Sequence, residues 1–135
     1  PHKIYEIAVL LPFSANFYKD VSTQAFNSLA LALFENQSVH KHYVLRPIDS
    51  GATEEDFNKA LEQIKDMAPE VVIGPLLTQN VVTLIDKADD FWYTRFLPLN
   101  ANPELLLIKK PENIWTVKQT TKYIIKYFCS LFFPL

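Results

Sequence analysis

The chain has 135 residues, of which 49% are hydrophobic and 13% aromatic, and it carries a formal net charge of -2 at pH 7. This length suits one domain with a single core, and this composition excludes an intrinsically disordered chain. The charge and the scattered lysines argue against a nucleic-acid-binding surface. No stretch reaches the roughly 18 uninterrupted apolar residues of a membrane span. The nearest, residues 123–135, is shorter and contains Lys126.

Apolar runs with strand character recur along the chain. The first ends in Ile7–Leu11 and is stopped by Pro12, which is typical of a strand buried on both faces of a parallel sheet. The second, residues 42–50, contains Pro47, which weakens its end or places it near an edge. Three more runs predict strands over residues 70–74, 95–100 and 113–117.

Segments with helical periodicity lie between these runs. Residues 20–36 place apolar side chains on one face, with Asp20 or Ser22 as the predicted N-cap. Residues 54–68 are the clearest helix: Thr53 caps it, acids fill its first turn, Glu55 pairs with Lys59, and Pro69 stops it. Its predicted buried stripe is Phe57, Ala60, Leu61, Ile64 and Ala68.

Two further helical segments follow. Residues 78–88 are predicted to be capped by Thr78 and to face the core with Val81, Val82, Ile85 and Ala88. A last helix is expected from about Thr120, and it contains the only cysteine, Cys129, interpreted as a buried apolar residue rather than a disulfide or metal ligand. Strands that alternate with amphipathic helices predict an α/β fold with a parallel sheet and helices on both faces.

Polar residues follow the predicted strands at their carboxyl ends, where open parallel sheets bind ligands. They are hydroxyl, amide and carboxylate groups, a set suited to a small polar ligand or a partner loop: Ser14, Asn16, Asp49, Ser50, Thr78, Gln79, Asn100 and Asn102. Each also suits an ordinary turn or cap position.

Signatures of catalysis and of cofactor binding are missing. The two glycines, Gly51 and Gly74, cannot form a glycine-rich nucleotide loop, and no serine lies in a nucleophile elbow. His40 and His42 have no neighbouring cysteine or carboxylate in the sequence to complete a metal site. Asp49 at a strand end suggests a phosphoacceptor, but no acidic pair follows the first strand. We therefore expect a protein that is not an enzyme and has no catalytic residue, cofactor or metal.

The strand-end motifs, taken in order, resemble the type I periplasmic binding proteins. Residues 7–34 resemble that family's opening strand, loop and first helix. Residues 47–81, with "VVIGPLLTQNV", resemble its second helix and Gly-Pro-Leu segment, and "FLPLNANPEL" its fourth strand and loop. Within the family, "VVIGPLLTQNV" and "LLPFS" most resemble the C-terminal domain of outer-membrane lipoproteins that activate penicillin-binding proteins.

The resemblance implies a binding protein of the bacterial envelope. In transport members the loops after strands three and four hold a ligand's α-carboxylate and α-amino groups, a role that would fall here on Leu76, Leu77, Thr78, Asn100 and Ala101. Pro75 lacks an N–H, and the two leucines are apolar, so these positions depart from the transport pattern. Ser14-Ala15 also replaces the family's Ser-Gly. These departures favour the activator branch.

The main hypothesis is an interaction module of an activator of a peptidoglycan synthase, a penicillin-binding protein, in the periplasm. The resemblance implies anchoring to the outer membrane as a lipoprotein, through a segment not in this chain. The alternative is a solute-binding domain for amino acids or similar small polar ligands in an uptake system.

The resemblance divides the chain into residues 1–118, a first lobe, and residues 119–135, an apolar segment near the crossover to a second lobe. Either the chain is a piece of a longer protein or it is a natural half. In the second case its apolar C-terminal segment packs on itself or on a second copy, which gives a homo-oligomer.

Overall fold

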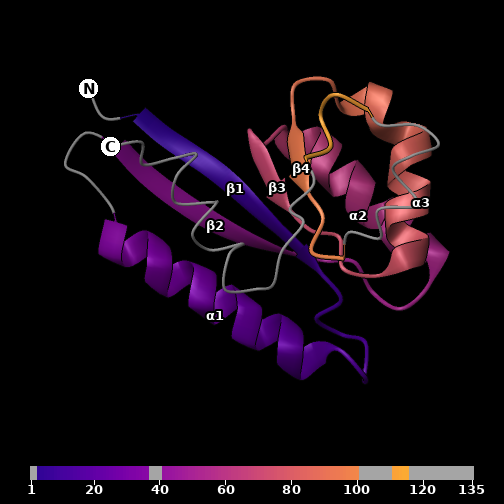
Figure 1. Ribbon diagram of the computed structural model, residues 1–135, viewed down its shortest axis with the longest axis horizontal. Helices are drawn as coiled ribbons and strands as arrows, with labels where there is room; N and C mark the ends of the chain where they lie inside the picture. The colour runs from indigo at the N-terminus through magenta and orange to yellow at the C-terminus, as the bar shows by residue number, and fades with distance from the viewer. Residues whose placement is uncertain (1–2, 37–40, 101–110, 116–135) are drawn as a thin grey trace.

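The computed structural model describes residues 3–36, 41–100 and 111–115. Strands and helices alternate along these ranges, as the sequence predicts (Figure 1). In chain order the elements are β1 (Lys3–Leu11), α1 (Lys19–Asn36), β2 (Lys41–Asp49), α2 (Glu54–Met67), β3 (Val71–Ile73), α3 (Thr78–Lys87), the 3-10 helix η1 (Ala88–Phe91) and β4 (Arg95–Leu97). None of the helices in these ranges is long and apolar enough to cross a membrane.

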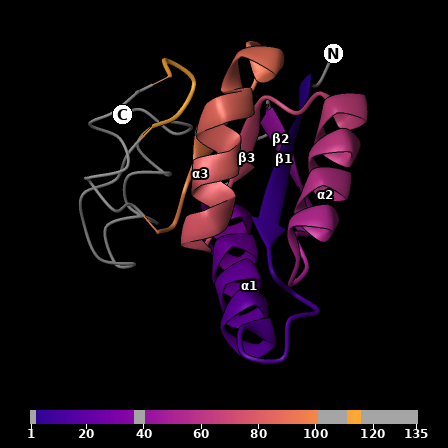
Figure 2. The same ribbon diagram turned by 90° about the vertical axis from the view of Figure 1, so that its right-hand side faces the viewer.

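The four strands form one parallel sheet in the order β2-β1-β3-β4. β1 and β2 pair over nine residues, from Lys3↔Lys41 to Leu11↔Asp49, whereas β3 pairs with each of its neighbours over three. α1 lies along one face of the sheet, and α2 and α3 lie on the other (Figures 1 and 2). This arrangement confirms the predicted α/β class with helices on both faces.

β1 is the central strand of the core. Ile7–Leu11 are completely buried, which confirms the expectation of a strand covered on both faces. Ala8 and Leu10 face the α2–α3 side, while Ile7, Val9 and Leu11 face α1. β2 lies at the edge of the described sheet, and Pro47 is tolerated there because its missing N–H removes no bond from a central strand.

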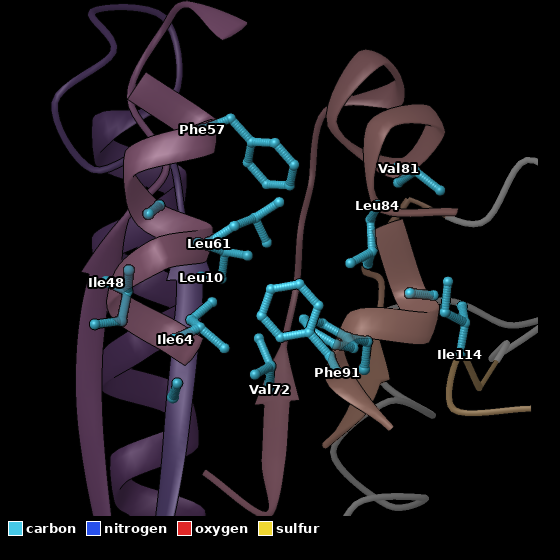
Figure 3. Packing of buried hydrophobic residues seen from close by; sticks show 14 of the residues in the cluster. Leu10, Ile48, Phe57, Leu61, Ile64, Val72, Val81, Leu84, Phe91 and Ile114 are labelled. Carbon is cyan, nitrogen blue, oxygen red and sulfur yellow. The ribbon is translucent and has the colours of Figure 1, made fainter. Parts of the chain in front are cut away.

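The larger apolar cluster fills the space between the sheet and the α2–α3 pair. Figure 3 shows Phe57, Leu61 and Ile64 of α2 turned toward the strands, with Leu84 of α3 across from them. Full burial of a side chain of this size stabilises the fold by about 1.5–3 kcal/mol. This cluster therefore fixes α2 and α3 on the sheet.

α2 begins as the sequence predicts. The Thr53 hydroxyl accepts the N–H of Asp56 (3.1 Å), and the Asp56 carboxylate accepts the N–H of Thr53 (3.3 Å), which completes a capping box. The Glu55–Lys59 ion pair forms at 3.2 Å. The assignment of Ala68 to the buried stripe is wrong: it is exposed and is the C-cap, in a left-handed conformation (φ 49°) with its N–H donated to the Ile64 carbonyl. Pro69 directly after it cannot continue the helix.

The N-cap assigned to α1 is wrong. The helix begins at Lys19, because the Ala15 carbonyl already accepts the N–H groups of Tyr18 and Lys19 (both 2.9 Å). Asp20 therefore lies in the first turn, and Ser22 lies inside the helix, buried, with its N–H donated to the Tyr18 carbonyl.

Two assignments in α3 are also wrong. Thr78 is the first helical residue rather than the cap, and Leu77 occupies the cap position without a side-chain bond. Val82 is 43% exposed, whereas Leu84 is fully buried. Leu84 lies three residues after Val81, so it and not Val82 continues the core-facing stripe at helical spacing.

The expected strand over residues 113–117 is reduced to a single parallel bridge between Ile114 and Phe96 in the part that the structure describes. Asn113 holds this segment in place, since its side-chain amide donates to the carbonyls of Ala88, Phe91 and Thr94 at 3.0, 2.9 and 3.2 Å. The expected helix from Thr120, Cys129 and the boundary at residues 118/119 lie outside the described residues.

Gly74 has a structural reason to be glycine. Its φ is +117°, and a Cβ at this position would overlap the carbonyl group of Leu10 on β1. The Gly74 N–H donates to the Leu97 carbonyl (2.8 Å), and the Gly74–Pro75 peptide is cis. The glycine therefore lets the chain leave β3 in direct contact with the backbone of β1.

We expect Gly74→Ala to lower the free energy of unfolding by about 3 kcal/mol or more, because it combines a disfavoured φ with overlap against backbone atoms that cannot rotate away. Urea denaturation followed by circular dichroism measures the change. Val82→Ala, a truncation of an exposed side chain, is the control and should cost less than about 1 kcal/mol. Superimposable curves for Gly74→Ala and the wild type would contradict this account of Gly74.

Candidate functional site

The carboxyl ends of the parallel strands bring four loops to one edge of the sheet, as the sequence predicts. Backbone hydrogen bonds connect these loops in pairs. The Ser50 N–H donates to the Leu11 carbonyl (2.9 Å), and the Leu99 N–H donates to the Pro75 carbonyl (3.0 Å). The edge is therefore a preformed surface built from loops that lie far apart in the sequence.

Asp49 connects the β1–α1 loop to the β2–α2 loop. One of its carboxylate oxygens accepts the N–H groups of Ser14 (3.2 Å) and Gly51 (2.9 Å). Partial burial raises the pKa of Asp49, but hydrogen bonds from the Ser14 side chain and from the two backbone N–H groups outweigh it and hold the pKa below its ordinary value of 3.8. Asp49 is therefore ionised at neutral pH, and its charge is used largely to position the two loops.

The β3–α3 loop is apolar where a ligand would approach. Pro75 is buried and has no N–H, and the Gly74 N–H is already bound to the Leu97 carbonyl. Leu76 is half-buried and packs against the α1-side cluster, while the half-buried Leu77 precedes the first turn of α3. The sequence prediction of an apolar loop at this point is consistent with these contacts.

The amide and hydroxyl groups after β3 and β4 bind each other. The side-chain amide of Asn100 donates to the Thr78 hydroxyl at 2.9 Å, so these two predicted site residues lie together. Ser14 and Asn16 are exposed on the β1–α1 loop. Ser50 is completely buried, and its hydroxyl has no hydrogen-bond partner among the described residues. Ala101 lies outside the described residues.

A hollow of about 350 Å³ opens at this edge between the first three loops. The β1–α1 loop forms most of its wall, and Ala52 and two residues at the start of α3 complete it: the lining is Ala15, Asn16, Phe17, Tyr18, Ala52, Leu77 and Gln79. None of these side chains is charged. The hollow suits an uncharged group that presents apolar surface and accepts hydrogen bonds from side-chain amides.

Phe17 and Tyr18 are site residues that the sequence interpretation missed. Phe17 is 94% exposed, the highest exposure of any large apolar side chain in the described ranges, and its ring lies 6.2 Å from that of Tyr18. Two adjacent aromatic residues directly after the Ser14–Asn16 loop were the available signal. The sequence candidates were polar groups at strand ends and positions implied by the family resemblance, and neither criterion includes an exposed aromatic pair.

No group of three or more histidine, cysteine, aspartate or glutamate side chains is placed to hold a metal ion in the part of the chain that the structure describes. His42 is exposed on β2, and His40 lies outside the described residues. The predicted strand-end residues thus meet at one edge, where apolar side chains and amides surround the Asp49 carboxylate. The Asp56 carboxylate lies on the adjoining β2–α2 loop and accepts the N–H groups of Ala52 and Thr53.

We expect Asp49→Ala to lower the free energy of unfolding by about 1 kcal/mol at pH 7, because two backbone N–H groups lose a charged acceptor at a partly exposed site. The folded-state pKa is depressed, so this stabilisation is present above the ordinary carboxyl pKa and is lost as the pH falls through the folded-state pKa. Urea denaturation between pH 7 and pH 2.5 should show the gap between wild type and variant closing below pH 3.8. Asp20→Ala on α1 is the control, and a gap of constant size would contradict this role.

Three solved structures illustrate what the chain resembles. It superimposes on full-length LpoA from Haemophilus influenzae with a TM-score of 0.64 and 19% identity, over 85% of this chain and 19% of that one. For a solute-binding protein of an ABC transporter from Rhodopseudomonas palustris HaA2, in complex with p-hydroxybenzoic acid, the TM-score is 0.68 at 16% identity. The match covers 84% of this chain and 31% of that one. For the leucine-binding protein LivK from Thermotoga maritima MSB8 the TM-score is 0.70 at 14% identity, over 93% of this chain and 37% of that one.

This chain spans about a fifth of the length of LpoA and about a third of the other two proteins. No protein-family model and no curated protein sequence matches it. At these identities the likeness concerns the fold, which in this chain is a parallel sheet with helices on both faces. The chain has the fold of a lobe of a type I periplasmic binding protein.

Proposed function

We propose that this chain is a non-catalytic binding module of the bacterial cell envelope, part of a lipoprotein that activates a peptidoglycan synthase (a penicillin-binding protein). The observation that carries the proposal is the uncharged lining of the hollow at the carboxyl edge, beside the apolar Pro75–Leu77 loop. The likeness to LpoA, a member of the activator family that the sequence resembles, supports it.

Free amino acids would be poorly matched by this edge. A zwitterion needs a counter-charge or well-placed donors for both its ends, since an unpaired ion loses several kcal/mol of hydration on binding. The Asp49 carboxylate already accepts two backbone N–H groups, and the Asp56 carboxylate accepts those of Ala52 and Thr53. Thr78 and Asn100 bind each other. A loop or side chain of a partner protein does not need counter-charges for two charged ends. It can use the exposed Phe17 as an apolar contact.

The module would act in the periplasm, held at the outer membrane by a lipid on a segment outside this chain. Self-association through residues 119–135 remains a second prediction, and sedimentation measurements at increasing protein concentration address it.

The proposal is tested by measuring binding of the purified chain to a penicillin-binding protein from the same envelope and the rate of glycan synthesis by that enzyme. We expect saturable binding and an increased rate. Leu77→Asp, which places a charge at the hollow, should weaken binding about tenfold or more. Asp20→Asn on α1 is the control. Neither binding nor stimulation, from a folded chain, would overturn the proposal.

A solute-binding domain is the second candidate. Hydroxyl and amide groups gather at the same edge, and two of the similar structures are solute-binding proteins, one of them holding an aromatic acid. A thermal-shift screen with amino acids, small amides and aromatic acids distinguishes the candidates. A true ligand at a hundredfold excess over its Kd stabilises the protein by about 2.7 kcal/mol. A flat screen counts against this alternative.

A further inference from the structure

Trp92 is an exposed aromatic side chain held in a fixed place. It is 80% exposed, while its neighbours Phe91 and Thr94 are buried. The ring of Tyr93 lies nearly perpendicular to that of Trp92, with centroids 5.4 Å apart, and the Tyr93 hydroxyl donates to the carbonyl of Lys65 on α2 (3.3 Å). The Thr94 hydroxyl donates to the carbonyl of Pro69 (2.7 Å). A large apolar ring positioned by its neighbours binds a partner with little loss of conformational entropy.

A groove of about 530 Å³ lies between α2 and the α3–η1 segment and reaches Asp90 and Phe91, directly before Trp92. Leu61 and Phe91 are its buried apolar residues, and charged side chains of both helices form its walls. The amine of Lys87 donates to the side-chain oxygen of Asn58 across it (2.7 Å). This hydrogen bond connects the two helices on either side of the groove.

Carboxylates outnumber amines on the helical segments that flank the groove. The last turns of α2 and the α3–η1 junction expose five carboxylates and two lysines: Glu62, Asp66, Asp86, Asp89 and Asp90 against Lys65 and Lys87. The difference of three negative charges is larger than the net charge of the entire chain, -2. Exposed carboxylates alone would be an ordinary solvated surface. Beside a fixed, exposed indole they complement a basic side chain, which an indole face also attracts.

We propose that the groove between α2 and α3–η1, with Trp92 at its end, is the docking surface for a basic segment of the partner protein. A lysine or arginine of that segment lies over Trp92, and its neighbours contact the carboxylates of Glu62 and Asp90. The surface involves helices α2 and α3 and η1, and none of the residues lining the hollow at the carboxyl edge. The identity of the partner rests on the proposed function, whereas the chemistry of the surface does not.

The test uses the whole chain with Trp115→Phe, which leaves Trp92 as its only tryptophan. Its fluorescence is titrated with a synthetic peptide of alternating lysine and leucine, and in parallel with one of alternating glutamate and leucine. We expect saturable quenching by the basic peptide, weakened by added salt, and none by the acidic one. Glu62→Gln combined with Asp90→Asn should weaken binding about tenfold, while Asp20→Asn on α1 should leave it unchanged.

The same surface is then tested on a penicillin-binding protein. Trp92→Ala should weaken binding about tenfold or more without unfolding the chain, and Val82→Ala, another exposed apolar side chain, should not. Equal affinity of wild type and Trp92→Ala, or quenching by both peptides, overturns this surface and leaves the proposed function standing. Quenching by the basic peptide alone, with no binding of the enzyme, supports the surface and overturns the proposed partner.

Discussion

The close approach of the β3–α3 turn to β1 is the constraint on which the rest of this structure depends. β1 is buried on both faces, and Gly74 lies against the carbonyl of its residue Leu10. The Gly74 N–H in turn reaches Leu97 on β4. The turn thus joins three strands at their carboxyl ends, and only a residue without a Cβ fits there.

The character of the carboxyl edge follows from this turn. Because the chain leaves β3 tightly and continues through Pro75, Leu76 and Leu77, the residues that reach the edge are apolar and the backbone donor of Gly74 is already used. Asp49 stabilises the opposite side of the edge by joining two loops. Both effects hold the loops of the edge in place and use its backbone donors and the Asp49 carboxylate in contacts within the lobe.

The charged residues lie on another part of the molecule. The solvent faces of α2 and α3 carry most of the carboxylates discussed above, while the apolar stripes of the same helices fill the core under them. A helix needs only about half of its surface for packing, so its other half is free to vary in charge. The lobe therefore has two chemically different surfaces: a carboxyl edge whose hollow has an uncharged lining, and a groove between α2 and α3–η1 whose walls carry charged side chains.

Much of the fold could be predicted from local patterns, because burial of one face gives each helix or strand a characteristic spacing of apolar residues. The run Ile7–Leu11 predicted a strand buried on both faces, the period of residues 54–68 predicted α2, and Thr53 marked its start. The errors at Ser22, Ala68, Thr78 and Val82 all concern helix ends or single faces. Local backbone hydrogen bonds at the helix ends decide these positions. The bonds to the Ala15 carbonyl, for example, start α1 earlier than the sequence predicted. Such bonds leave little trace in the sequence.

The sequence predicted where the candidate site lies in the fold but not which contacts its side chains make. Parallel strands bring their carboxyl ends together, so the sequence by itself determined which loops would meet. Only the tertiary structure decided that Ser50 is buried, that Asp49 serves the loops, that Asn100 binds Thr78, and that Phe17 and Trp92 stand exposed. Periodicity records whether a residue faces the core, whereas the partner of a polar or aromatic side chain depends on which distant loops and helices lie beside it.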